Sequence, residues 1–85
     1  MLTTRYTTIS NTVYTVEEGF GCTFVTRQGA RITGRGYGTD LDWPDGQRVP
    51  VAEVQVRANG GLHIVAREWD VPSLFTSRVR EMLTV

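Results

Sequence analysis

The segment 48–67 (RVPVAEVQVRANGGLHIVAR) constrains the fold more than any other part of the chain. Two runs of alternating apolar and polar residues flank Asn59-Gly60-Gly61, a combination typical of a β-hairpin. A three-residue loop would place Val56 opposite Ile64, with one apolar face and one polar face. The apolar positions shift by one before Ala52, which predicts a bulge or bend in the first strand.

The N-terminal segment 3–17 also favours strands, because it is dense in threonine, tyrosine and valine. Asn11 divides it, so we expect two strands or one broken strand. In the second half, Tyr14 and Val16 share one face. Residues 18–21 contain two glycines and predict the first tight turn.

A second hairpin is indicated in the segment 22–36, with Gln28-Gly29 as a two-residue loop. This loop would place Val25 opposite Ile32 as an apolar pair. The following segment, 37–47, concentrates glycine, aspartate and proline and predicts a loop.

The character of the chain changes at its C-terminal end, where a helix is predicted over about 71–83. Asp70 or Ser73 can cap such a helix, and Pro72 suits its first turn. The apolar residues that follow recur at helical spacing: Leu74, Phe75, Val79, Met82 and Leu83.

These elements predict a mainly β (α+β) fold in one small domain, 1–85, because 85 residues leave no room for a second core. The strands fall within 3–67. We expect a small antiparallel sheet or a partly open barrel of SH3-like or OB-like size, with one C-terminal α-helix.

Composition limits the function classes. Nine basic and nine acidic residues cancel, which removes the long-range field that drives non-specific binding to nucleic acid or anionic lipid. All nine basic residues are arginine, whose planar guanidinium binds carboxylates and phosphates. Cys22 is the single cysteine, and neither a signal peptide nor an 18-residue apolar span is evident, so we expect a cytoplasmic protein without membrane contact.

No arrangement of residues predicts catalysis or metal binding. His63 is the single histidine, and Cys22 reads as a small apolar residue rather than a reactive thiol. Asp40, Asp42 and Asp45 lack the spacing of a calcium loop. We therefore expect no enzyme, no cofactor and no metal.

The candidate binding residues form two groups. Arg27, Arg31, Arg35 and Tyr37 make a locally basic patch, since no acid lies between Gly19 and Thr39. Three alternating glycines around Arg35 and Tyr37 would let a phosphate approach the backbone, although the spacing matches no known phosphate loop. A solvated arginine-rich hairpin explains the same pattern.

Two tryptophans complete the candidate set. Trp43 and Trp69 each lie beside acidic residues in turn-like sequence. Tryptophan in such a setting anchors either an interface or the core of a small domain.

Together these features predict a non-catalytic binding module, an accessory, adaptor or inhibitor protein whose partner is a larger protein or a second copy of the chain. The alternative hypothesis is a small β-barrel that binds nucleic acid through Arg27, Arg31, Arg35 and Tyr37. The two differ in whether acids neutralise the arginines in the folded protein.

Overall fold

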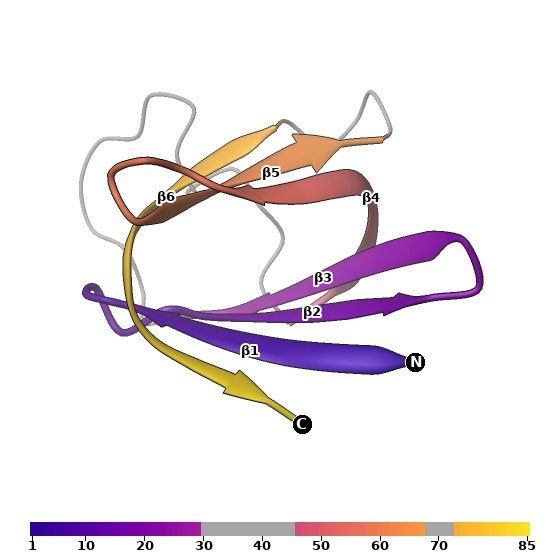
Figure 1. Ribbon diagram of the computed structural model, residues 1–85, viewed down its shortest axis with the longest axis horizontal. Coiled ribbons are helices and arrows are strands. Elements are labelled where there is room, and N and C mark those ends of the chain that lie inside the picture. The colour runs from indigo at the N-terminus through magenta and orange to yellow at the C-terminus, as the bar shows by residue number, and fades with distance from the viewer. Residues whose placement is uncertain (30–45, 68–72) are drawn as a thin grey trace.

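A computed structural model describes residues 1–29, 46–67 and 73–85, which form a closed barrel of six antiparallel strands (Figure 1). Each strand pairs with the next along the chain, and the last pairs with the first. The mainly β prediction is confirmed, but the barrel is closed rather than partly open. The strands are β1 (Leu2–Thr8), β2 (Val13–Gly19), β3 (Cys22–Gln28), β4 (Arg48–Val56), β5 (Gly61–Ala66) and β6 (Leu74–Thr84).

Short turns with left-handed residues connect β1 to β2, β2 to β3 and β4 to β5. Asn11, at φ 67°, lies between β1 and β2, as the division of the N-terminal segment predicted. Phe20 and Gly21 form the turn between β2 and β3, and Gly60 turns the chain between β4 and β5. The first turn is therefore shorter than predicted, since β2 continues to Gly19.

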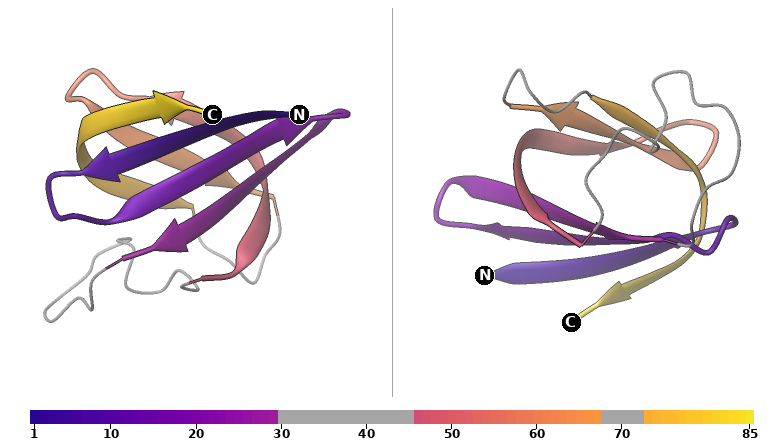
Figure 2. Two further views of the ribbon diagram at one scale, coloured as in Figure 1. Left: turned by 90° about the horizontal axis from the view of Figure 1, so that it is seen from below. Right: turned by 180° about the vertical axis from the view of Figure 1, so that it is seen from behind.

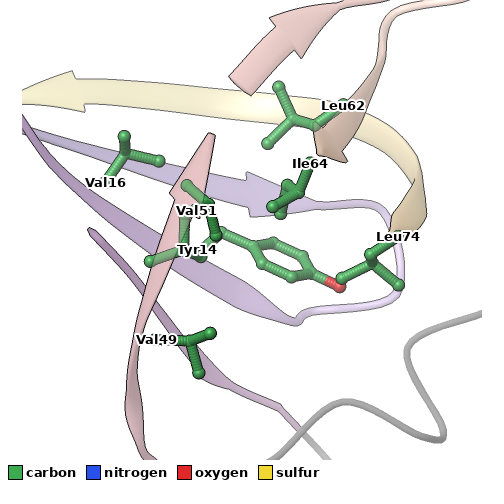
Figure 3. Close-up of a cluster of buried hydrophobic side chains, with 8 residues drawn as sticks. Tyr14, Val16, Val49, Val51, Leu62, Ile64 and Leu74 are labelled. Atoms are coloured by element: carbon green, nitrogen blue, oxygen red, sulfur yellow. The ribbon is translucent and has the colours of Figure 1, made fainter. Parts of the chain in front are cut away.

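The core fills the barrel interior with alternate residues of the strands. Tyr14 and Val16 point inward together, which confirms their predicted shared face. Figure 3 shows Tyr14 among the aliphatic side chains of the opposite wall. The buried cluster consists of Tyr14, Val16, Val25, Val49, Val51, Leu62, Ile64 and Leu74.

The β4–β5 hairpin is present, with one apolar and one polar face, but its register differs from the prediction. Val56 pairs with Leu62 rather than Ile64, because the three-residue turn comprises residues 58–60 instead of the predicted 59–61. This difference of two residues in the partner strand leaves every side chain on its predicted face. The predicted bulge is confirmed as a register shift between Val51 and Glu53.

The predicted hairpin within 22–36 is wrong in two respects. Gln28 belongs to β3 and pairs with Val13, so it is not a loop residue. Val25 pairs with Val16 on one side and Val49 on the other, which leaves no edge for Ile32. Residues 30–45, including Ile32 and most of the predicted loop, lie outside the described residues.

The predicted C-terminal helix over 71–83 is also wrong. Residues 74–84 form β6, the strand that closes the barrel between β5 and β1, and none of the described residues is helical. Residues 68–72, which include the predicted capping Asp70 and Pro72, lie outside the described part.

Two bulges in β6 explain the error. Between β5 and β6 the register advances from Gly61–Arg78 to His63–Phe75, and between β1 and β6 from Thr8–Val79 to Thr7–Glu81. Each shift adds a residue to β6, so the positions on the interior side by register become 74, 76, 79 and 82, of which Met82 is 59% exposed. Steps of two, three and three imitate helical periodicity, although the segment is extended.

Candidate functional site

Of the six sequence-predicted site residues, the structure describes Arg27 alone. Arg31, Arg35, Tyr37, Trp43 and Trp69 lie outside the described residues. Arg27 pairs with Tyr14 across β2 and β3 and is 5% exposed. Because Arg27 is buried and is not without an interaction partner, its guanidinium is not a free group on the surface.

An outer-face cluster that was not among the predicted site residues lies on β5, β6 and the turn that follows β4. We call Arg57, His63 and Phe75 the aromatic cluster. His63 alternates with the inward Leu62 and Ile64, so it points outward, and it pairs with Phe75 across β5 and β6. The side chain of Arg57, the residue that follows β4, reaches over Phe75.

The geometry of the aromatic cluster is close-packed but open to solvent. The rings of His63 and Phe75 are 4.3 Å apart between centroids with 10° between their planes. The Arg57 Cζ lies 4.6 Å from the Phe75 centroid, within the range of cation–π attraction. Phe75 nevertheless remains 47% exposed.

A further arginine, Arg78, lies on β6 near the aromatic cluster. Arg78 pairs with Gly61, and its Cγ is 2.9 Å from where a Cβ on Gly60 would stand. Neither Arg57 nor Arg78 makes an ion pair within the described residues. Glu53, on β4, accepts a hydrogen bond from Gln55 instead of contacting an arginine. Both guanidinium groups are thus available to an anion.

A second arginine–phenylalanine pair, on β3 and β4, has the opposite electrostatic character. The Arg48 Cζ lies 3.8 Å from the Phe24 centroid. The Arg48 Nε also donates to Glu17 Oε1 at 3.1 Å, and this acid neutralises it. The Arg48–Phe24 pair is a useful comparison for the aromatic cluster. Both contain an arginine over a phenylalanine ring, but only Arg48 is paired with an acid.

Exposed apolar residues gather at one end of the barrel. We call Met1, Leu2, Phe20, Leu83 and Val85 the apolar end; each is at least half exposed. The Val85 N–H donates to Thr3 O, and Met1 lies against Gly19 at the end of β2. The two chain ends and the β2–β3 turn accordingly lie along one side of the barrel (Figure 2).

Phe20 is the most exposed of these residues, at 94%. Phe20 and Gly21 have φ angles of 55° and 75°, the pair of positive values that a type I′ hairpin turn requires. Glycine or asparagine normally occupies the first of these positions, because a bulky side chain is strained there. Phe20 stands between two glycines in the sequence, a local signal that predicts the turn but not the exposure of its bulky side chain.

Within the described residues, no group of three histidine, cysteine, aspartate or glutamate side chains could hold a metal ion. Cys22 is a free cysteine whose side chain is half-buried. Tyr6, at the edge of the core, has a pKa raised above 10.0, chiefly because burial penalises the phenolate and further because Glu18 repels it.

The described part of the chain contains no helix with the length and apolarity of a membrane span. No protein family model, curated protein or solved structure matches the chain.

Proposed function

We propose that this protein is a non-catalytic binding module that docks on a partner protein through the apolar end, with Phe20 as the anchoring side chain. The observation that carries the proposal is the state of Phe20, which is 94% exposed while held at a positive φ. Neither property helps the fold. Exposure forfeits the stabilisation that burial of a phenylalanine supplies, and the left-handed backbone costs about 1–2 kcal/mol.

A strained and solvent-exposed aromatic residue is explained by a role outside the folded chain. Aromatic side chains that project from a surface are common anchors in protein interfaces, because they fill a pocket and lose few rotamers. Met1, which lies against Gly19, and Leu2, which pairs with Glu18, add exposed apolar surface near the turn that carries Phe20.

The mode of binding follows from barrel closure. Each described strand is hydrogen-bonded to a neighbour on both sides, so the described sheet has no free edge to which a partner strand could add. Recognition at the apolar end therefore depends on side chains. A larger protein with an apolar pocket is the proposed partner, and a second copy of the chain is the competing one.

The test compares Phe20→Asn with Ile9→Asn. Asparagine suits the left-handed turn position, and Ile9 is a similarly exposed apolar residue at the β1–β2 turn, away from the apolar end. Quantitative cross-linking in extracts of the native host should recover a partner with the wild type and Ile9→Asn, and recover it at least about tenfold less with Phe20→Asn, a loss of the size expected for an interface anchor.

Sedimentation velocity of the three purified proteins separates the two kinds of partner. A dimer that dissociates in Phe20→Asn alone would identify the chain itself as the partner. Equal recovery of the same proteins by all three variants, with no self-association, would contradict the proposal.

A further inference from the structure

We propose that the aromatic cluster, together with Arg78, binds single-stranded nucleic acid. Phe75 and His63 would offer a surface for base stacking, and Arg57 and Arg78 would contact phosphates. This site differs from the apolar end in position and chemistry, and it does not depend on the proposed docking function.

The first support is the unpaired charge. Arg57 is held in place by Phe75 rather than by an acid, so its N–H donors remain free. Arg78 lies on the other side of Gly61, whose carbonyl accepts the Arg57 N–H at 2.8 Å. Two neighbouring guanidinium groups without acid partners match the phosphates of a nucleic-acid strand.

The second support is the exposed stack. The rings of His63 and Phe75 stack face to face, and part of this stack remains accessible to solvent, with Phe75 47% exposed. Arg57 contacts Phe75 at 4.6 Å, more loosely than Arg48 contacts Phe24 at 3.8 Å. A phosphate could therefore draw Arg57 from the ring and leave that face to a base.

The combination of rings and guanidinium groups favours a single strand over other anions. Bases of a single strand are free to stack on aromatic side chains, whereas a duplex hides their faces. An acidic peptide would use the two arginines but would gain little from the His63–Phe75 stack. Because the net charge of the chain is zero, the attraction is local and the expected affinity is modest.

The experiment is a fluorescence-anisotropy titration of a labelled short oligothymidylate and of the matching oligouridylate, repeated between about 20 and 200 mM salt. Saturable binding of at least one strand is expected. Two phosphate contacts predict a slope of about −1.4 in the logarithm of the binding constant against the logarithm of salt concentration, since each contact on a single strand contributes about −0.7.

Three variants locate the site. Arg57→Ala should weaken binding and reduce the slope to about −0.7, and Phe75→Leu, which keeps an apolar residue in the strand, should weaken binding at least about fivefold through lost stacking. Arg48→Ala should leave binding unchanged, because its guanidinium is already paired with Glu17. Circular dichroism confirms that each variant is folded.

Three outcomes would overturn the proposal. These are the absence of saturable binding at the lowest salt, an equal loss in Arg48→Ala and Arg57→Ala, and full affinity in Phe75→Leu. Displacement of the oligonucleotide by an equimolar polyglutamate peptide would likewise overturn it and assign the arginines to an acidic protein segment.

Discussion

His63 and Phe75 face each other across β5 and β6 with their rings stacked in parallel, 4.3 Å apart between centroids. The contact lies beside the register shift between Gly61 and His63, where β6 carries its extra residue. A cross-strand pair next to a bulge can fix the register that the bulge disturbs. The same rings thus contribute to the fold and to the proposed nucleic-acid surface.

A double-mutant cycle should measure this contribution. We expect His63→Ala and Phe75→Ala to be coupled by about 0.5–1.5 kcal/mol in the free energy of unfolding, the range found for aromatic pairs. Urea unfolding of the wild type, the two single variants and the double variant provides the four values. Additive losses would mean that the rings do not stabilise each other.

Thr76 supplies a side-chain hydrogen bond at the same bulge, where the strand register shifts. Its buried Oγ1 accepts the Leu62 N–H at 2.9 Å and donates to Ser77 O at 2.8 Å. Thr76→Val keeps the shape but removes the acceptor, so the free energy of unfolding should fall by about 1–3 kcal/mol. Hydrogen exchange of the Leu62 amide should be faster in Thr76→Val than in the wild type. Thr76→Ser retains the hydroxyl and should keep the wild-type exchange rate at Leu62.

Gly61 is required for a close backbone approach. A Cβ at this position would stand 2.6 Å from Thr76 O, a distance that forces β5 and β6 apart. Gly61→Ala should therefore lower the free energy of unfolding by about 1–3 kcal/mol, as overpacking does elsewhere. An unchanged midpoint of urea unfolding would show that the two strands can separate without loss.

Phe20→Asn should stabilise the protein, in contrast to its effect on partner binding. Asparagine tolerates the positive φ that strains phenylalanine, so we expect a gain of about 1 kcal/mol and a rise in Tm of about 4–8 °C for a domain of this size. Phe20→Leu retains the strain and should leave the Tm nearly unchanged. Calorimetry of the three proteins checks this, and a lower Tm in Phe20→Asn would contradict it.

The raised pKa of Tyr6 predicts that the free energy of unfolding falls in alkaline solution. Its pKa in the folded protein is raised above 10.0, so between that value and the folded pKa the unfolded chain has released the proton while the folded chain retains it. The stabilisation of the folded state by the protonated Tyr6 is therefore complete below about pH 10 and declines as pH rises through the folded pKa. Urea unfolding between about pH 8 and 11 should show a smaller decline in Tyr6→Phe than in the wild type, and equal declines would argue against it.

Much of the barrel wall was predictable because alternation in a strand directly reports which face is buried. The shared face of Tyr14 and Val16, the turn at Asn11 and the bulge after Val51 all follow from local patterns. Strand β6 was not predictable by the same argument, because its two bulges change the period of the pattern.

The surface features were harder to predict because they depend on pairing between distant segments. Pairing of β5 with β6 is what brings together Arg57, His63 and Phe75. The sequence pattern predicts a helix in place of β6, so it could not predict this contact. Arg27 shows the converse, since a charged residue predicted to form part of a surface patch proves to be buried beside Tyr14. Phe20 alone carried a local signal, a bulky residue in a turn.

Pairing of β1 with β6 joins segments about as far apart in the chain as its length permits. A growing chain cannot complete these hydrogen bonds until β6 has been synthesised, so β1 and β5 each leave an open edge until then. Contacts between such distant residues also make folding slow, because a long loop must close before they form. Newly made chains therefore pass through a period, before the barrel closes, in which they can exchange β6 with one another, and a low concentration of chains would favour the monomer.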